Sequence, residues 1–246
     1  MLKFKNVSFA YEKDRPVLKD ISFTIAEGEA VGLIGSNGAG KSTLLKALAG
    51  LITCRGEIKA AGLPMCRENL PEIRRRLGFV LQDCDDQLFM PTVLEDMMFA
   101  PLNYGFSKED AEAKADAALK RLELTELKHR HNHKLSGGEK RMAAIATILA
   151  MEPRALIVDE PTIALDPQNR RAVINTLNSI ECTRLIASHD LDMILDTCDR
   201  VILLFDGKIV ADGKTADILN DKELLESHRM ELPLGIAALR KERLCD

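Results

Sequence analysis

Hydrophobic residues along the chain gather in short, nearly uninterrupted runs separated by longer polar and amphipathic segments. The runs read GFVLQ (78–82), ALIVD (155–159), TRLIAS (183–188) and RVILLF (200–205). Runs that are apolar at almost every position are typical of parallel strands covered on both faces by helices. The pattern therefore predicts an α/β fold built on a parallel or mixed sheet.

The beginning of the chain follows a different pattern. LKFKNVSF (2–9) alternates polar and apolar residues with an approximate period of two, and ISFTI (21–25) and AVGLI (30–34) follow at short spacing. This pattern predicts an antiparallel or mixed sheet near the N-terminus.

The segment between Thr92 and Lys134 contains no apolar run of this kind. SKEDAEAKADAALKRLEL (107–124) instead begins with Ser107 and Asp110 at the spacing of a helix cap and continues with strong helix formers. We therefore expect a helical insertion of roughly 40–50 residues, which is the size of a subdomain. The amphipathic stretch 221–244 predicts one or two peripheral helices.

At 246 residues the chain is long enough for one large domain or one with a subdomain. We expect a single domain, with an α/β core from 1–91 and 151–246, a helical subdomain at about 92–150 and C-terminal helices at about 221–246.

Composition changes this picture mainly by what it excludes. Aromatic residues make up 4%, there is no tryptophan and the net charge is -4, so we expect no nucleic-acid partner. Apolar stretches such as AAIATILA (143–150) fall short of the ~20 residues that span a bilayer, so another chain would supply any membrane span. The six cysteines are scattered without a C-x-x-C pair or a leader sequence, which predicts reduced thiols in a cytosolic protein.

The first chemical motif is GSNGAGKST (35–43), directly after the apolar run AVGLI. It matches G-x-x-x-x-G-K-[ST] in its strand–loop–helix context. Its glycines let the backbone bend so that several N–H groups and a helix N-terminus point at one phosphate cluster. Lys41 would neutralise the β- and γ-phosphates and the Ser42 hydroxyl would ligate Mg²⁺. By itself the motif indicates only phosphate binding, because kinases, GTPases, helicases and transport ATPases share it.

The second motif is ALIVDE (155–160), followed by PTIALDP (161–167). Asp159, at the carboxyl end of a buried strand, can reach Mg²⁺ through water, and Glu160 is suited to orient or deprotonate an attacking water. Two acidic residues can also form a merely solvated strand end. The phosphate loop in the same chain favours the chemical interpretation.

The third motif is LSGGEKRMAAIATILA (135–150), in which Ser136 would be the N-cap of a helix. Two glycines and Glu139 follow, so free N–H groups gather at a second positive helix end. Two such ends cannot easily grip one γ-phosphate from the same side. Ser136 to Gly138 would therefore serve a nucleotide held by another copy of the chain.

With these motifs the chain resembles the nucleotide-binding subunit of an ATP-binding-cassette (ABC) transporter, from Tyr11 to Gly213 and through six ordered motifs. The resemblance implies an ABC-type P-loop NTPase fold: a RecA-like mixed or parallel sheet core, an N-terminal antiparallel β subdomain and a helical signature subdomain. It implies an ATPase that uses ATP and Mg²⁺ on the cytoplasmic face of a membrane, with integral membrane subunits and a second ATPase subunit as partners.

The resemblance also implies roles for individual residues. Tyr11 would stack on adenine, although a partly buried strand-end tyrosine is an alternative. Gln82 would touch Mg²⁺ and water and relay the nucleotide state to the membrane partner. Catalysis would rest on Glu160, His189, Lys41 and Gln82, and Mg²⁺ on Ser42, Gln82 and Asp159. The nucleotide would be bound by Tyr11, Gly35, Ser36, Asn37, Gly38, Ala39, Gly40, Lys41, Ser42, Thr43, Ser136, Gly137, Gly138, Glu139 and Asp166.

Two positions depart from the family pattern. Glu139 stands where many members have glutamine, which would alter a ribose contact. Ile163 stands in the D-loop where a small residue is common, which puts the packing across the dimer in doubt. Neither change removes a phosphate or magnesium contact.

A finer resemblance lies in FVLQDCDDQLFMPTVLEDMMFAPLNYGFS (79–107), which is similar to ATPase subunits of energy-coupling-factor importers of nickel, cobalt or vitamins. It implies a groove for a coupling helix at Asp86, Gln87 and the helix from Val93. Met90, Met97 and Met98 suit such a groove, since methionine packs adaptably, but they could equally fill the core. The short C-terminal segment resembles the branch with a single ATPase, which favours a homodimer and a cobalt or nickel cargo.

The histidines His129, His131 and His133 precede the third motif. Zinc needs four ligands, or three and water, and no cysteine or acidic residue lies close in sequence to complete a set. We expect a solvated linker, with weak nickel or cobalt binding as the alternative.

Rival functions remain. A vitamin importer ATPase would share every motif. A soluble ABC ATPase of translation or DNA repair would normally carry two cassettes or a long coiled coil. A small-molecule kinase would share only the phosphate loop and would not explain LSGGE.

Overall fold

The computed structural model describes residues 1–242, with side chains described up to residue 240. These residues pack as two compact units. The first unit comprises Met1–Ile73 and Cys182–Asp246, and the second comprises Arg74–Glu181. The expected helical insertion at about 92–150 lies wholly within the second unit.

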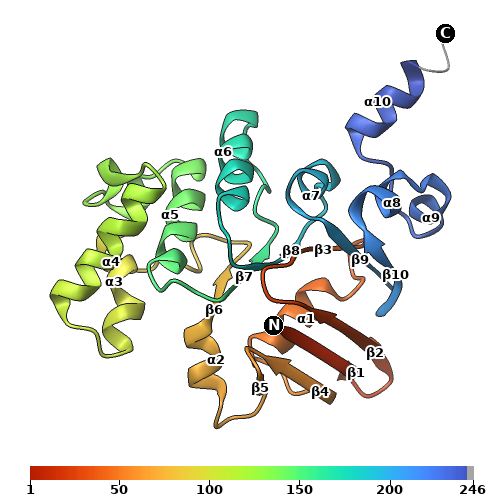
Figure 1. Ribbon diagram of the computed structural model, residues 1–246, viewed down its shortest axis with the longest axis horizontal. Helices are drawn as coiled ribbons and strands as arrows, with labels where there is room; N and C mark the ends of the chain where they lie inside the picture. Colours follow the sequence, from red (N-terminus) through yellow and green to blue (C-terminus); the bar gives the residue numbers. More distant parts are fainter. Residues whose placement is uncertain (243–246) are drawn as a thin grey trace. The chain divides into compact units, whose positions relative to one another are not determined.

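The first unit contains the antiparallel sheet that the alternating N-terminal pattern predicts. Its strands are β1 (Leu2–Glu12), β2 (Arg15–Ile25), β4 (Arg55–Ala60) and β5 (Leu63–Pro64), in the order β2-β1-β4-β5 (Figure 1). Leu2 and Phe4 are buried whereas Lys3 and Lys5 are exposed, so alternate residues face the core and the solvent. The Phe4 and Phe23 rings stack at 4.5 Å between β1 and β2.

The apolar runs of the first unit form β3 (Ala30–Ile34), β8 (Thr183–Ala187) and β9 (Arg200–Phe205). β3 pairs in parallel with both β8 and β9, as the apolar runs of β8 and β9 predict. β3 itself, expected beside the N-terminal strands because of its short spacing, belongs to this parallel arrangement instead. β10 (Lys208–Lys214) adds an antiparallel edge beside β9 that the hydrophobic pattern did not reveal. All of β3 is buried, so the loop that follows it starts from a rigid strand.

Helices of the first unit follow these strands. They are α1 (Lys41–Leu48), α7 (Leu191–Thr197), α8 (Thr215–Asn220), α9 (Lys222–Ser227) and α10 (Leu234–Glu242). The last two correspond to the predicted peripheral helices, and the end of that predicted stretch lies outside the described residues. α10 begins on α7, because the Asp192 carboxylate accepts the N–H groups of Leu234 and Gly235 at 2.9 and 3.0 Å.

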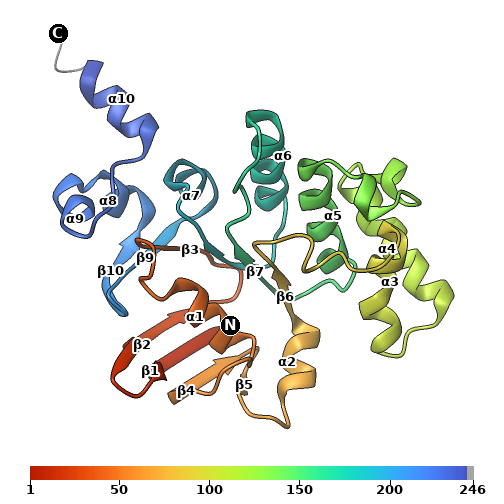
Figure 2. The same cartoon turned by 180° about the vertical axis from the view of Figure 1, so that it is seen from behind.

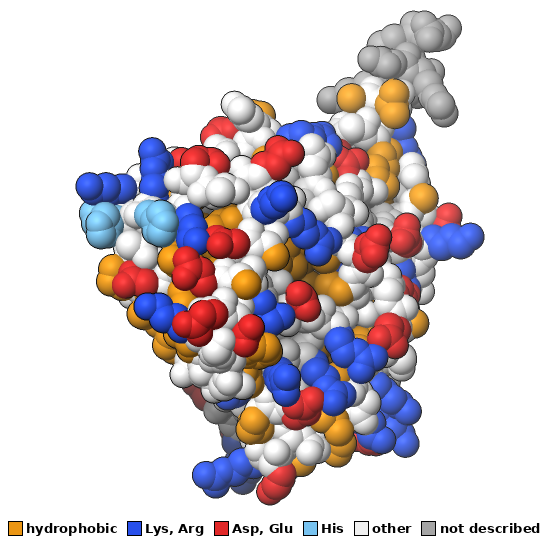
Figure 3. Space-filling model, turned by 60° about the vertical axis from the view of Figure 1, so that its left-hand side comes forward, with side chains coloured by type: hydrophobic (Ala, Val, Ile, Leu, Met, Phe, Trp, Pro, Cys, Tyr) orange, Lys and Arg blue, Asp and Glu red, His pale blue; other side chains and the backbone are white. Residues whose placement is uncertain are grey.

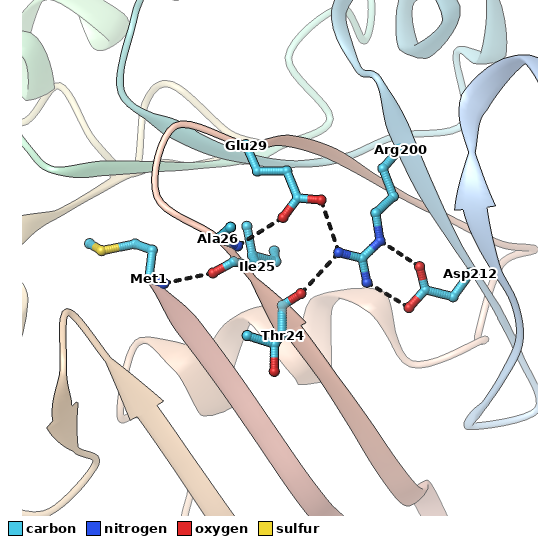
Figure 4. A network of polar contacts seen from close by, with 7 residues as sticks. All are labelled: Met1, Thr24, Ile25, Ala26, Glu29, Arg200 and Asp212. Atoms are coloured by element: carbon cyan, nitrogen blue, oxygen red, sulfur yellow. Dashed lines mark hydrogen bonds and ion pairs between the residues drawn. The ribbon is translucent and has the colours of Figure 1, made fainter.

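One arginine joins the strand ends of the first unit (Figure 4). Arg200 donates to both carboxylate oxygens of Asp212 at 2.6 and 2.7 Å, to Glu29 at 2.9 Å and to the Thr24 carbonyl at 3.0 Å. The hydrogen bonds to Asp212 hold the pKa of the Arg200 guanidinium above its usual range. A bidentate, charge-assisted pair of this kind fixes β9, β10 and the β2–β3 turn together.

The second unit pairs β6 (Leu77–Val80) in parallel with β7 (Ala155–Asp159), again as the apolar runs predict. Its helices are α3 (Val93–Asn103), α4 (Lys108–Arg121), α5 (Gly137–Leu149) and α6 (Pro167–Asn178), with short 3₁₀ turns at Thr125–Leu127 and Asn132–Lys134. α2 (Leu70–Arg76) contains the chain position at which the two units divide. Figures 1 and 2 both draw α3 beside α4.

The predicted helix caps are present in the second unit. The Ser107 hydroxyl accepts the Asp110 N–H at 3.0 Å at the start of α4. Residues 92–134 are all described, and they contain a single isolated β-bridge, between Thr92 and His131, in place of strands. The prediction of a helical segment without strands is therefore confirmed.

A buried carboxylate organises the loop before α3. Asp96 accepts N–H groups from Phe89 and Met90 at 3.2 and 3.0 Å, and its other oxygen accepts from the Asn132 side chain. Burial raises the pKa of the Asp96 carboxyl despite these hydrogen bonds. The loop at 89–92 and the segment at 128–132 are thus held as one piece. Within the described residues, every helix is shorter or less apolar than a membrane crossing requires.

Candidate functional site

The phosphate loop of the first unit is shaped by two glycines with different tasks. A Cβ on Gly35 would overlap the Leu204 carbonyl oxygen and lie 3.1 Å from its carbon, so Gly35 permits close approach to β9. Gly38 has a φ of +80° with no described atom within 4 Å of a Cβ position, so its role is conformational. Gly40, the N-cap of α1, has no side chain to cap the first-turn N–H groups, which suits them to bind phosphate.

Lys41 is held inside this loop. Its side chain is in a residue only 7% exposed, and its Nζ donates to the Gly35 carbonyl at 2.7 Å. The same Nζ lies 3.0 Å from Nε2 of His189, which follows β8. Because an ammonium group can only donate, Nε2 is the acceptor of this contact. The first unit therefore brings together two of the residues to which the resemblance assigns catalysis, Lys41 and His189.

Tyr11, Ser42 and Thr43 lie around the same loop. Tyr11 is 58% exposed at the end of β1, its ring meets Phe9 edge-on at 4.8 Å, and its hydroxyl lies 3.5 Å from the Thr43 hydroxyl. This exposure disfavours the alternative of a partly buried strand-end tyrosine and leaves ring surface for a base. Ser42 is exposed in the first turn of α1.

The acidic pair of the second unit ends β7. Asp159 is half-buried, whereas Glu160 is 9% exposed and has a φ of +46°. Ala164, in the D-loop that follows, has a φ of +58°. Left-handed backbone is uncommon for residues other than glycine and costs of order 1–3 kcal/mol at each position. The strained turn at Glu160 is the kind of feature that collects at reactive sites.

The segment around Gln82 is held by the helix of the third motif. Arg141 on α5 is 3% exposed and donates to the carbonyls of Leu81 and Gln82 at 2.7 and 2.6 Å. Gln87 accepts the Leu81 N–H at 3.0 Å and donates to the Ala144 carbonyl at 2.6 Å. The Gln82 side chain itself is exposed. Sequence reasoning missed Arg141, and its only signal was a basic residue one turn into α5.

A cavity of about 660 Å³ opens beside this segment in the second unit. It is lined by the loop 81–86, the start of α5 and the D-loop residues 163–165. Ile163, the departure from the family pattern, is 47% exposed at its edge. The same cavity is thus lined by the Gln82 segment, the D-loop and the start of α5, which carries the third motif and is called the signature helix below.

The signature begins at Ser136, the N-cap of α5, as predicted. Its hydroxyl accepts the Glu139 N–H at 3.3 Å, and the Glu139 carboxylate accepts the Ser136 N–H at 2.8 Å, which completes a capping box. Arg130 donates to the same carboxylate at 3.0 Å. The backbone hydrogen bond from Ser136 lowers the pKa of the Glu139 carboxyl. The unusual glutamate therefore has a structural role in capping.

Asp166 starts the next helix in the same way. It is the N-cap of α6 and accepts the N–H of Asn169 at 2.9 Å, which lowers the pKa of its carboxyl. Asp166, which belongs to the D-loop, is exposed to solvent.

The predicted site residues divide between the units. The first unit contains Tyr11, the loop 35–43 and His189, and the second contains Gln82, the signature 136–139, Asp159, Glu160 and Asp166. The hydroxyl, amide and carboxylate oxygens of Ser42, Gln82 and Asp159 are the hard donors that Mg²⁺ prefers. The chemistry of this donor set fits the expected cation.

The histidine run is exposed and lies over the loop 91–92. His131 Nδ1 is 3.3 Å from the Pro91 carbonyl, and its ring centroid is 5.4 Å from that of His133. Figure 3 shows histidine side chains at the surface among lysine, arginine and acidic side chains. The part of the chain that the structure describes contains no group of three or more histidine, cysteine, aspartate or glutamate residues arranged for a metal. This supports a solvated lead-in to the signature.

Comparison with known proteins identifies the family of this chain. The ABC transporter family model matches residues 18–163. A putative ABC transporter ATP-binding protein of Geobacter sulfurreducens is 44% identical over 96% of this chain and 95% of its own length. An energy-coupling factor transporter ATP-binding protein, EcfA, of Carboxydothermus hydrogenoformans is 40% identical over 95% of this chain and 87% of its own length.

Two solved structures agree with these relatives. CbiO1 from Clostridium perfringens, described as part of the ABC transporter complex cbiONQ, has a TM-score of 0.83 and 32% identity, covering 97% of this chain and 98% of its own. The ATP-binding cassette MJ0796, in a dimeric post-hydrolysis state with ADP and phosphate, has a TM-score of 0.76 and 30% identity, covering 87% of this chain and 99% of its own. The chain therefore belongs to the ABC transporter family: it has the ABC ATPase fold, is an ATPase that uses ATP and Mg²⁺, and is similar to the energy-coupling-factor type.

Proposed function

We propose that this chain is the ATP-hydrolysing subunit of an energy-coupling-factor importer that takes up cobalt or nickel ions at the cytoplasmic face of the cell membrane. The observation that carries the ATPase assignment is the buried Lys41 ammonium, held between the Gly35 carbonyl and His189 within the phosphate loop. The relative named EcfA and the likeness to CbiO1 of a cbiONQ complex support the transporter type.

ATP is bound between two copies of the chain in this proposal. The loop 35–43 of one copy holds the phosphates, Tyr11 stacks on the adenine, and Ser136 to Glu139 of the other copy close over the γ-phosphate. Ser136 and Gly137 are exposed at the start of α5, and no atom of the described residues lies within 4 Å of a Cβ position on Gly137. An uncovered helix N-terminus of this kind suits a phosphate that comes from a second subunit.

Hydrolysis follows from the same residues. Glu160, held in its strained turn, orients or deprotonates the attacking water, and His189 hydrogen-bonds the γ-phosphate. Lys41 offsets the charge that develops on the phosphate oxygens. The residues that would hold Mg²⁺ are Ser42, Gln82 and Asp159, and the ion would supply further electrostatic stabilisation. Asp166, in the D-loop, is one of the residues that bind the nucleotide in this proposal. Loss of the γ-phosphate weakens the attraction between the copies, which reopens the pair.

The sequence left open whether the methionines line a groove for the membrane subunit or fill the core. Met97 and Met98 are 0% and 6% exposed, so the alternative of core filling is correct for both. Phe89 and Phe99 are instead 58% and 43% exposed, and their rings meet edge-on at 4.8 Å. We call these two residues, with the exposed Leu102 and Tyr104, the aromatic patch.

The aromatic patch suits the coupling role for two reasons. A cluster of exposed large apolar side chains marks a surface that another protein covers. It is also tied to the signature, because Asp96 accepts the Phe89 N–H and binds Asn132, shortly before Ser136. A push on the patch by a membrane subunit would therefore reach the signature helix.

Uptake of radiolabelled nickel and cobalt tests the proposal, in cells that lack this gene and are complemented with wild type or Glu160→Gln. We expect wild type alone to restore uptake. Restored uptake by both, or by neither, would contradict an ATP-driven metal importer, and labelled vitamins would then test the vitamin alternative.

The coupling surface has its own test. The double variant Phe89→Ala with Phe99→Ala should lose uptake while the purified chain still hydrolyses ATP. Neither phenylalanine is among the residues assigned to nucleotide binding or catalysis. Leu51→Ala, which removes a side chain that is 67% exposed in the first unit, is the matched control and should keep uptake. Uptake by the phenylalanine double variant would exclude the aromatic patch as the coupling surface.

The number of chain types is a separate question. We propose a homodimer, so the purified Glu160→Gln variant alone should form dimers on addition of ATP and Mg²⁺. If dimers form only with a sister ATPase, the working pair is a heterodimer.

A further inference from the structure

The two glycines of the signature lie in different surroundings. A Cβ on Gly137 would meet open space among the described atoms. A Cβ on Gly138 would lie no more than 2.5 Å from the carboxamide carbon, oxygen and nitrogen of Asn169 on α6. Real side-chain atoms do not approach so closely, so a residue larger than glycine at 138 must displace Asn169. Gly138 is thus required by a contact within the chain.

The Asn169 side chain has little freedom to move away. Its Nδ2 donates to one oxygen of the Asp166 carboxylate at 2.5 Å, and its backbone N–H donates to the other at 2.9 Å. A hydrogen bond to a carboxylate is stronger than one between neutral groups. The carboxamide is therefore held by the D-loop aspartate on one side and abuts the signature glycine on the other.

The helices that carry these residues are also packed farther along. The Thr176 hydroxyl of α6 donates to the Met142 sulfur of α5 at 3.9 Å, and both residues are buried. Figures 1 and 2 draw α5 beside α6 from both sides. Since this second contact restrains the spacing of the helices, a larger residue at 138 cannot be absorbed simply by moving them apart.

From this geometry we propose that Asn169 is a positioning residue of the ATPase, which sets the spacing between the signature at Gly138 and the D-loop at Asp166. The inference rests on the proposed function of these two segments at the ATP shared by two copies. A displacement of about 1 Å in a segment that positions the nucleotide is enough to cost a large factor in rate.

A double-mutant cycle on the purified full-length chain tests the proposal. In the wild-type background, Gly138→Ala should lower kcat by about tenfold or more, since misplacement on this scale costs up to ~10²-fold. In the Asn169→Ala background, which removes the carboxamide, the same substitution should cost less than about twofold, because interacting residues are not additive. Gly137→Ala is the control, and its effect should be the same in both backgrounds. An equal loss from Gly138→Ala in both backgrounds would overturn the proposal.

Single variants of Asn169 separate positioning from general stability. Asn169→Ala should lower kcat severalfold and leave the KM for ATP unchanged, because the phosphate loop is intact. Asn169→Asp keeps the size of the side chain but sets two carboxylates against each other, so it should lower kcat as well. Asn169→Ser can still donate to Asp166 and should keep more activity than Asn169→Ala. A fall in melting temperature without a change in kcat would reduce Asn169 to a structural role and overturn the proposal.

Failure of the proposed function gives a different result. If Glu160→Gln hydrolyses ATP as fast as wild type, the assignment of the catalytic site fails. The melting temperatures of the Gly138 and Asn169 variants would still report whether the two positions are sterically coupled.

Discussion

The two units of this ATPase prepare for phosphate in opposite ways. In the first unit the loop 35–43 is shaped by backbone conformation, and its lysine is buried and already paired with the Gly35 carbonyl and His189. In the second unit Ser136 and Gly137 are exposed at the start of α5. The first unit therefore holds its lysine already paired, whereas the second presents an exposed helix start at which the Ser136 and Glu139 N–H groups are bonded to each other's side chains.

The difference extends to what each residue does for the fold. Gly35 is needed both for the phosphate loop and for the approach to Leu204, so catalysis and stability are joined there. Ser136 and Glu139 also cap α5, but their capping bonds are local and solvent-exposed. We therefore expect changes in the first unit to have larger effects than equivalent changes in the second.

The largest effect is expected for Lys41→Ala. Removal of the ammonium group takes away the charge that faces the developing phosphate charge, and loss of one such group typically costs about 10²–10³ in rate. Phosphate release at saturating ATP measures this effect. Lys46→Ala, on an exposed residue in the last turn of the same helix, should keep wild-type turnover. Near-normal turnover by Lys41→Ala would contradict the role of the buried, paired lysine of the first unit in phosphate chemistry.

Next in size is the contrast between Gly35→Ala and Gly137→Ala. A methyl group at 35 overlaps the Leu204 carbonyl oxygen, and overpacking of this kind costs about 1–3 kcal/mol of unfolding free energy. The same group at 137 meets no described atom within 4 Å, so stability should change by less than about 0.5 kcal/mol. Urea unfolding of both variants decides the matter, and equal losses would remove the proposed difference between the units.

A smaller effect is expected from Ser136→Ala. Loss of this N-cap should lower the unfolding free energy by about 1 kcal/mol, as for other serine caps. Thr92→Ala removes the matching capping box of α3 and should cost a similar amount. Only Ser136→Ala should also lower ATP hydrolysis. If both variants hydrolyse ATP at the same rate, the Ser136 hydroxyl has no role beyond capping.

The smallest effect is a pH dependence at Glu139. Its folded pKa is lowered from 4.5 by the hydrogen bond from the Ser136 N–H, so the unfolded chain takes up the proton first as the pH falls. The stabilisation by Glu139 is then fully present above the unfolded pKa of 4.5 and is lost as the pH falls through the lower folded pKa. Thermal melting of wild type and Glu139→Gln should differ at neutral pH and converge in acid. A difference that grows in acid would have the wrong sign.

Local patterns predicted much of this fold. The parallel strands β6, β7, β8 and β9 follow from apolar runs, because a strand buried on both faces has to be apolar at nearly every position. Short spacing wrongly grouped β3 with the N-terminal strands, because spacing along the chain does not say which sheet a strand joins. The caps at Ser107 and Ser136 follow from spacing alone, since a cap is made within one helical turn. The edge strand β10 escaped prediction because its sequence KIVADGK mixes charges and glycine with apolar residues.

The aromatic patch shows the limit of such patterns. Methionines and phenylalanines are neighbours in sequence at 89–90 and 97–99, in and just before α3. Hydrophobicity alone does not say which of them face the core. The structure buries Met97 and Met98 and exposes Phe89 and Phe99. The loop at 89–92, held by Asp96, turns Phe89 outward, and that arrangement depends on Asn132, which lies 36 residues from Asp96 in the sequence.

By itself the sequence determined which segments become strands and helices and which carry phosphate chemistry, because these properties depend on neighbours within a few residues. Only the tertiary structure decided that Lys41 meets His189 across 148 positions, that Arg141 holds the carbonyls of Leu81 and Gln82, and that Gly138 abuts Asn169. Such contacts depend on how close-packed elements meet, and no periodicity along the chain encodes that arrangement.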